Sequence, residues 1–493
     1  MLIQDILKKL SFENYLQILV LSIPLLLITG PFLPDLFLTL SSLSFLIYLF
    51  FEKKINFLKK KIFYLFSIFF FILVISSFLS DYKIKSLITS LGYFRFGIFL
   101  FVVSYLIKKK KNFIKNLCFI LISIFIILLI DSFLQLLSGS NMFGTPAPYG
   151  RITSLFGEDI KLGGYIARLT PLLIALLVYL KSNKKIVFII FLISLFLTLI
   201  SGERTSFLML LMFLFGFTVF CNISIKLKLS FLLIPLVLIF IISLNQEFRY
   251  RVLTTTMNQI NLTKEKPFFK FITTEEGNNI VLNRDSTIFP RIYHMYFETV
   301  IKIFKDNYII GSGPRTYPLK SKEEKYYTVS SHQGWIDFEK NRNSDKEIRG
   351  KLYNIHIDQI KKNKNLVNEL DFNERLKDEA WQKENHFILL KDGYIIRKFS
   401  GFTNLSGVNS HPHNTYLQLL CETGIAGFLY VIVLWFYCIF RVFSKIDLYY
   451  KCLLLGLIVN LFPFMFTGNF FNGWLTILYF YPLGFLLDEN LKT

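Results

Sequence analysis

Two histidines lie where a long polar segment meets an apolar run, a position from which a side chain can act on a substrate at a membrane surface. The stretch reads Ser410-His411-Pro412-His413-Asn414, and the apolar run begins directly after it. The unperturbed pKa of histidine is close to neutral pH, so imidazole is the usual proton acceptor in catalysis. His413 is therefore the first candidate for a general base, and His411 is the alternative.

Arginines in polar turns between apolar runs are candidates for contacts with a phosphorylated substrate. Arginine is always charged and forms bidentate contacts with phosphate oxygens. Arg204 is the clearest case, because it lies in a very short turn where a charge without a partner is costly. Its alternative roles are an interfacial anchor or an ion pair with Glu203. The other candidates are Arg151, Arg291 and Arg315. For Arg291, the alternative role is that of a solvated residue at the start of a helix.

A glycine-rich turn, Gly311-Ser312-Gly313, follows the helix predicted after Arg291. Its glycines have two possible roles. They allow a tight turn, and they also allow backbone N–H groups to approach a phosphate closely. Gly311 and Gly313 are therefore kept as candidate substrate-binding residues beside Arg315.

The elements that position these residues are predicted to be membrane helices. The chain has 493 residues, is 53% hydrophobic and contains 56 phenylalanines. Several apolar runs approach the roughly 20 residues needed to cross a bilayer. The net charge of +21 lies largely in short lysine clusters between these runs, which is typical of cytoplasmic loops and argues against a nucleic-acid partner. The scattered cysteines predict neither a metal site nor a disulfide framework.

Hydropathy predicts an all-α polytopic membrane protein with about twelve spans. The expected spans are about 14–30, 35–51, 62–80, 92–107, 113–137, 162–180, 185–201, 204–221, 229–245, 415–440, 450–468 and 472–487. The chain thus divides into transmembrane residues 1–245, a large outer loop domain at 246–413, and transmembrane residues 414–493. Lysine clusters fall in alternate loops, so both termini are expected in the cytoplasm, and the 246–413 segment is expected outside.

Two local elements are predicted within the outer segment. Residues 289–304 form an amphipathic helix, because Ile292, Tyr296, Val300 and Ile303 recur at near-helical spacing. This face is expected to lie on the membrane or to pack on the spans. Residues 389–396 read as a small hairpin with Asp-Gly as its turn. Residues 320–385 are rich in charged residues and are expected to form an inserted, solvent-exposed subdomain.

The spacing around His413 resembles a known family. His413-Asn414, nine residues and then Gly424-x-x-Gly427 resemble the H-[NSQ]-x9-G-x-x-G signature of the O-antigen ligases and the related O-antigen polymerases. The family also carries a serine- and glycine-rich arginine motif, which residues 201–206 resemble. It further carries an arginine ahead of a helix that ends in a G-x-G-x-x-[FY] turn. Arg291 and residues 311–317 are similar to this, with one extra residue before Tyr317.

The resemblance implies a bacterial inner-membrane glycosyltransferase of lipopolysaccharide biosynthesis, active on the periplasmic face without a metal or other cofactor. Its donor is an undecaprenyl-pyrophosphate-linked glycan, and its acceptor is lipid A–core for a ligase or the growing glycan for a polymerase. In this role His413 takes the proton of the acceptor hydroxyl, while Arg204 and Arg291 stabilise the pyrophosphate that leaves with inversion. Asn414 orients the imidazole or the acceptor.

Other assignments remain open at this stage. Glu422 lies within the motif and is either a second functional carboxylate, a helix-entry charge or a partner for an arginine. The sequence does not separate ligase from polymerase. A transporter of lipid-linked saccharides would place charged or broken helices near mid-membrane, and a non-catalytic receptor would not need the histidine and arginine set.

Overall fold

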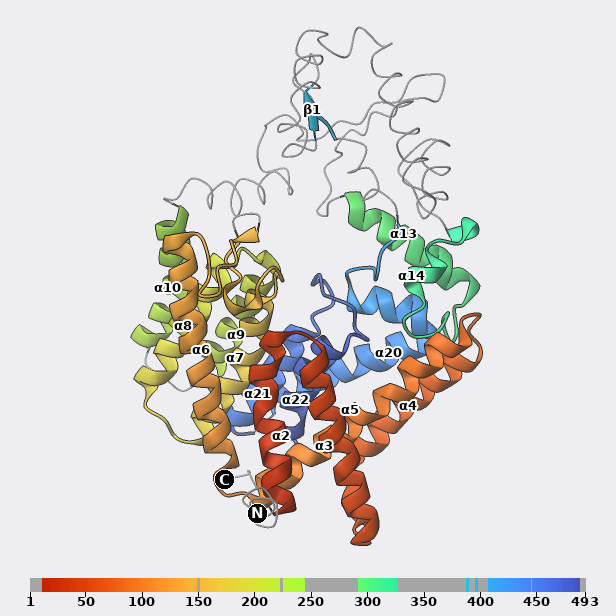
Figure 1. Cartoon of the computed structure of the whole chain (residues 1–493), viewed down its shortest axis with the longest axis horizontal. Helices are drawn as coiled ribbons and strands as arrows, with labels where there is room; N and C mark the ends of the chain where they lie inside the picture. The colour runs from red at the N-terminus through yellow and green to blue at the C-terminus, as the bar shows by residue number, and fades with distance from the viewer. Residues whose placement is uncertain are drawn as a thin grey trace.

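The structure is a bundle of helices with a small helical region at one end (Figure 1). It is a computed structural model that describes residues 11–148, 151–221, 225–243, 291–326, 387–389, 395–397, 407–444 and 446–487. The first helices are α2 (Phe12–Leu26), α3 (Phe32–Phe51), α4 (Lys61–Phe78), α5 (Lys83–Lys109), α6 (Phe113–Ser138), α7 (Leu162–Tyr179), α8 (Lys184–Ile200), α9 (Arg204–Phe220) and α10 (Ile225–Ser243). The later ones are α13 (Arg291–Asp306), α14 (Tyr317–Lys320), α20 (Thr415–Phe443), α21 (Leu448–Asn460) and α22 (Gly473–Phe485).

A helix lies in every segment predicted to span the membrane. Within the described residues, 7 helical segments are long and apolar enough to cross a bilayer, beginning at Phe12 and ending with α20. Helices α9 and α21 are apolar but shorter. The chain is thus a polytopic membrane protein by the length and composition of its helices, and the count of about twelve spans stays a prediction.

The centre of the bundle combines helices from both ends of the sequence. α7 is the most buried of the candidate spans, and α21 packs along it. α22 packs along α5 in the same way. The last two helices therefore complete the core that the earlier ones begin, and they hold the start of α20 in a fixed place.

Lysines from two of the lysine-rich loops contact the ends of other helices in the bundle. Lys110 Nζ donates to Asn14 Oδ1 at 2.6 Å, which joins the end of α5 to the start of α2. Lys60 Nζ reaches the carbonyl of Leu487, just after α22, at 3.3 Å. At the other end of α4, Ser80 donates to the carbonyl of Ser312. The assignment of the lysine-rich end to the cytoplasm remains a prediction from the charge pattern.

The amphipathic helix predicted at 289–304 is confirmed as α13. Tyr296, Val300 and Ile303 are buried, and α13 packs on α20. This apolar face was expected either to lie on the membrane or to pack on the spans, and in the structure it packs on the helical bundle. The predicted hairpin is also present: β1 (Phe387–Leu389) pairs antiparallel with β2 (Ile395–Arg397). Its Asp-Gly turn and most of the 246–413 segment, including nearly all of 320–385, lie outside the described residues.

Candidate functional site

His413 lies in the loop that precedes α20, and neighbouring groups fix its backbone. Its φ angle is 56°, a left-handed conformation that is uncommon for residues other than glycine. The His413 carbonyl accepts from the N–H of Thr467 at 2.9 Å. The next residue, Asn414, caps α20 by accepting from the N–H groups of Tyr416 and Leu417. The loop that carries the imidazole is therefore held at Thr467, in the segment between α21 and α22, and at the start of α20.

Aromatic rings surround the His413 imidazole. Tyr296 is roughly parallel to it with ring centroids 5.3 Å apart, and Tyr293 meets it edge-on at 5.9 Å. The His411 ring lies closer still, at 4.1 Å. Burial lowers the pKa of His413, and burial together with the neighbouring His413 lowers the pKa of His411 to about 3. Both imidazoles are therefore neutral near pH 7, the state that accepts a proton.

Asn409 is a partner of His413 that the sequence did not single out. Its Nδ2 lies 3.2 Å from His413 Nε2 and donates to the Tyr296 hydroxyl at 2.6 Å. Its Oδ1 accepts from the N–H of Ser410, which fixes the orientation of the amide. Nδ2 thus faces the imidazole as a donor, so Nε2 of His413 is the acceptor and the neutral ring carries its proton on Nδ1.

Replacing Asn409 with aspartate should raise the pKa of His413. A carboxylate favours the imidazolium, whereas the amide N–H opposes it. Because a general base works only when neutral, we expect the acidic limb of the pH–rate profile to move up by roughly one unit or more. Asn472→Asp is the matched control, since Asn472 is an exposed cap of α22 and aspartate caps equally well. Equal profiles for the two variants would rule out the contact between Asn409 and His413.

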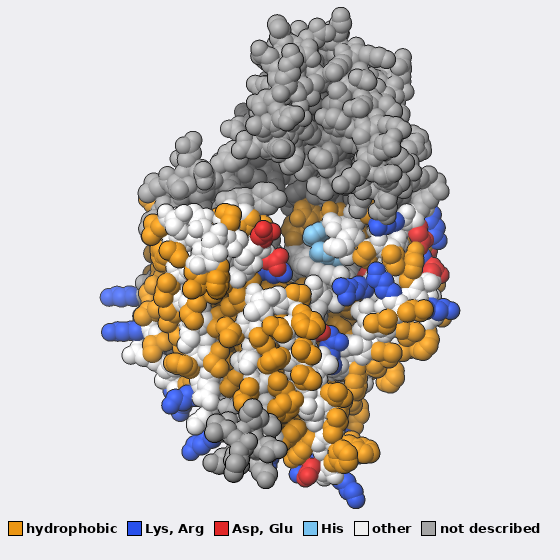
Figure 2. Space-filling model, viewed as in Figure 1, with side chains coloured by type: hydrophobic (Ala, Val, Ile, Leu, Met, Phe, Trp, Pro, Cys, Tyr) orange, Lys and Arg blue, Asp and Glu red, His pale blue; other side chains and the backbone are white. Residues whose placement is uncertain are grey.

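Tyr293, which contacts the His413 ring, is also within electrostatic range of Arg204. Burial raises the pKa of the Tyr293 phenol, and the positive charge of Arg204 opposes that rise, so the two side chains are close. Arg151 is a second cation within electrostatic range of Arg204. Figure 2 shows histidine side chains in a hollow of the surface, with charged side chains around it. Tyr293 thus lies near both the predicted base and Arg204, one of the predicted arginines.

Arg291 is placed by its backbone alone. It is the first residue of α13, two positions before Tyr293 on the same helix. The prediction that Arg291 opens a helix is confirmed, whereas its side chain lies outside the described residues. Its contribution to the site remains a prediction.

The Gly311–Gly313 turn docks on a kink in α20. The N–H groups of Ser312 and Gly313 donate to the carbonyls of Cys421 and Glu422, both at 2.9 Å. The N–H of Gly311 donates to Asn307. All three amides of the turn are used inside the protein, so the turn does not offer them to a phosphate. Gly311 and Gly313 thus have the tight-turn role here.

Asn414 and Glu422 also have structural partners. The Asn414 amide donates to the carbonyls of Pro463 and Met465, so both ends of this buried side chain are occupied. It therefore secures the loop that carries His413 and does not face a ligand. The fully buried Glu422 carboxylate accepts from the N–H of Tyr317 and from Gln418 Nε2, and it interacts with Arg315. Its direct side-chain and backbone partners are thus an amide and N–H groups, and the Arg315 side chain acts on it through charge alone.

Arg315 lies beside the histidine loop in a small polar cavity of about 340 Å³. Lys85 adds a second cation to the lining, and Ser410, whose hydroxyl lies 2.8 Å from His411 Nδ1, adds a hydroxyl. Two pairs of cations therefore lie in the region of the histidine pair: Arg204 with Arg151, and Arg315 with Lys85. Lys85 carries no sequence signal, because it lies far from every motif.

Comparison of the chain with protein-family models, with curated proteins and with solved structures finds no match in any of the three.

Proposed function

We propose that the protein is a glycosyltransferase of the O-antigen ligase type. It moves a glycan from undecaprenyl pyrophosphate to a hydroxyl of lipid A–core at the periplasmic face of the bacterial inner membrane. One observation carries the proposal. A neutral, half-buried His413 lies at the end of a membrane helix bundle, in contact with Tyr293, whose phenol is within electrostatic range of the cation Arg204.

In the proposed reaction, the acceptor hydroxyl replaces the Asn409 amide at Nε2 of His413. Nε2 takes the hydroxyl proton as the oxygen attacks the anomeric carbon. The bond from that carbon to the pyrophosphate oxygen breaks on the opposite face, so the configuration inverts. Arg204, with Arg151 nearby and Arg291 at the start of α13, stabilises the charge that grows on undecaprenyl pyrophosphate.

The cavity beside His411 supports a place for the acceptor. Arg315 and Lys85 line this cavity together with Ser410, and such cations would bind an anionic group on the acceptor. The acceptor would then be held beside the histidine pair while the donor pyrophosphate contacts Arg204, so that both substrates are positioned for transfer.

The acceptor decides between ligase and polymerase. Purified protein is mixed with undecaprenyl-pyrophosphate oligosaccharide, with or without lipid A–core, and the products are sized on a gel. We expect a product only when lipid A–core is present. A ladder without that acceptor would make the protein a polymerase, whose acceptor is the growing glycan. No product in either mixture, from protein shown to be folded, would contradict the proposed transfer.

A further inference from the structure

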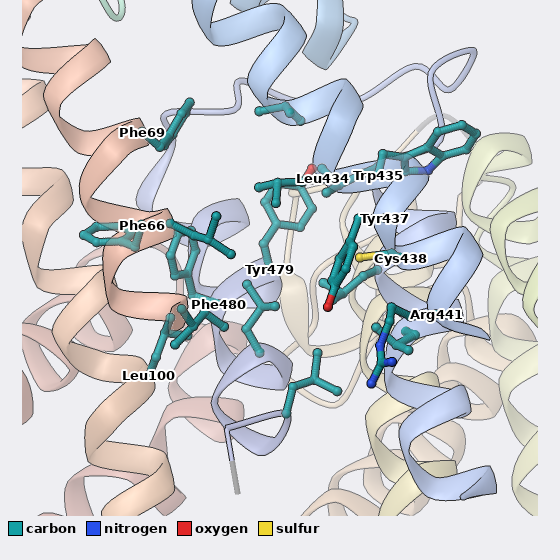
Figure 3. Close-up of a pocket in the computed structure, with 18 of the residues that line it drawn as sticks. Phe66, Phe69, Leu100, Leu434, Trp435, Tyr437, Cys438, Arg441, Tyr479 and Phe480 are labelled. Carbon is teal, nitrogen blue, oxygen red and sulfur yellow. The ribbon is translucent and has the colours of Figure 1, made fainter. Parts of the chain in front are cut away.

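A large apolar cavity is lined on one side by helices α4, α5 and α22, which pack together, and on the other side by helix α20, with α21 also contributing. Its volume is about 890 Å³, within the range of cavities that hold small molecules or lipid chains. Its walls are mainly aliphatic and aromatic, with Phe66, Leu100, Leu434 and Phe480 among the side chains that Figure 3 shows. None of the residues assigned to the histidine site lines it.

Specific contacts hold the walls in place. Tyr430 of α20 stacks on Phe69 of α4 with centroids 5.5 Å apart, and its hydroxyl donates to the carbonyl of Leu65. Trp435 Nε1 donates to the carbonyl of Ile458, which ties α20 to α21. α20 therefore touches α4 near Tyr430, and the cavity continues along α20 to Arg441 (Figure 3).

One end of the cavity is positively charged. Lys61, the first residue of α4, and Arg441, near the end of α20, both line it. Neither forms a salt bridge with a carboxylate of the described residues. Asp447 is the carboxylate among the lining residues, so the cations outnumber it. This end belongs to the lysine-rich side of the bundle, where Lys60 lies beside Leu487.

The cavity also borders the surface that faces lipid. α20 is the least buried of the candidate spans among the described residues. Its Phe436, Tyr437 and Phe440 are exposed, and Tyr437 also lines the cavity. A hydrocarbon chain can therefore enter sideways from the bilayer while its headgroup stays at the membrane surface.

We propose that this cavity binds an anionic phospholipid of the cytoplasmic leaflet. The acyl chain lies between α4 and α20, and the phosphate lies between Lys61 and Arg441. Charge complementarity selects the occupant, because an apolar chain with an anionic phosphate matches an apolar cavity with two cations at one end. The site is separate from the proposed glycan transfer, since the donor's pyrophosphate would lie at the opposite end of the bundle.

Binding is tested by native mass spectrometry of the full-length protein released from detergent. The probes are palmitoyl-oleoyl phosphatidylglycerol, the corresponding phosphatidylcholine and undecaprenyl phosphate. We expect the wild-type protein to prefer the phosphatidylglycerol. Lys61→Gln with Arg441→Gln should weaken its binding about tenfold or more, because each surface cation favours an anionic lipid. Lys184→Gln with Lys185→Gln removes the same charge from exposed positions outside the cavity and should have little effect.

A second variant tests whether the cavity binds the acyl chain of the lipid, without changing the charge of the protein. Leu434→Trp fills the cavity and should reduce phosphatidylglycerol binding while the protein keeps its elution volume and melting temperature. Equal binding of the two phospholipids by wild-type protein would overturn the proposal, as would unchanged binding in either cavity variant. A loss of undecaprenyl phosphate alone in Leu434→Trp would overturn it as well, because the cavity would then hold the polyprenyl chain.

Discussion

The His413→Ala variant is expected to lose glycan transfer by about a hundred- to ten-thousandfold, the usual contribution of a general base. The acceptor hydroxyl is a poor nucleophile until its proton is removed, and His413 Nε2 is held unprotonated by burial and by the Asn409 amide. The measurement is the initial rate with purified protein, undecaprenyl-pyrophosphate oligosaccharide and lipid A–core. Elution volume and melting temperature report whether the variant remains folded.

Two further variants make this result specific. His411→Ala removes the ring that packs 4.1 Å from His413 and should cost about tenfold or less, because His411 does not take the proton. His332→Ala makes the same change at a histidine that belongs to no motif and should leave the rate unchanged. If His411→Ala caused the larger loss, the base would be His411. Full activity of both His413→Ala and His411→Ala would exclude a base at this position.

The second large effect is expected from an added methyl group at Gly311. Its φ of 79° disfavours any residue with a side chain, and its Cβ would lie 2.4 Å from backbone atoms of Glu422, Thr423 and Gly424. The backbone is equally close on the other side of this contact, because a Cβ at Gly424 would lie 2.4 Å from the backbone of Ile309. We expect Gly311→Ala to lower the free energy of unfolding by roughly 3 kcal/mol, from backbone strain plus overpacking.

We expect Gly311→Ala to lose glycan transfer as well as stability. The turn holds α13 on α20, and α13 carries Tyr293 and Tyr296 to the His413 ring. Gly139→Ala is the matched control, because Gly139 has a similar φ of 81° but nothing within 4 Å of its added Cβ. Its cost should be limited to about 1–2 kcal/mol of backbone strain. Equal losses in detergent-unfolding curves for the two variants would show that the close approach of α20 does not matter.

The helices could be predicted from the sequence because apolar length and the lysine clusters are local signals. The prediction was weakest at helix ends. The expected span at 450–468 overlaps α21, which begins at Leu448 and stops at Asn460, and Pro463 follows shortly after. Proline cannot continue a helix, so the chain turns there, and Pro463 and Met465 supply the carbonyls that hold Asn414.

The candidate site could be predicted only in part. His413 stands out through the spacing of His413-Asn414 to Gly424 and Gly427, and Arg204 stands out through its position in a very short turn between two apolar runs. Asn409 and Tyr296 could not be identified as site residues from the sequence, because their contacts depend on how α13 packs against the loop before α20. For Gly311 and Gly313, the residues could be identified from the sequence but their role could not. Their spacing is visible, but whether the neighbouring N–H groups face a ligand or α20 depends on long-range packing.

Transfer and transport can be compared in one preparation, and this comparison tests the central claim most directly. Proteoliposomes receive donor with a labelled glycan, together with lipid A–core, and both the label and free undecaprenyl pyrophosphate are followed. We predict that the label moves to lipid A–core and that one undecaprenyl pyrophosphate appears for each glycan moved. His413→Ala should stop both. Intact labelled donor that crosses the bilayer without changing carrier, equally with wild-type protein and His413→Ala, would contradict the account and indicate a transporter.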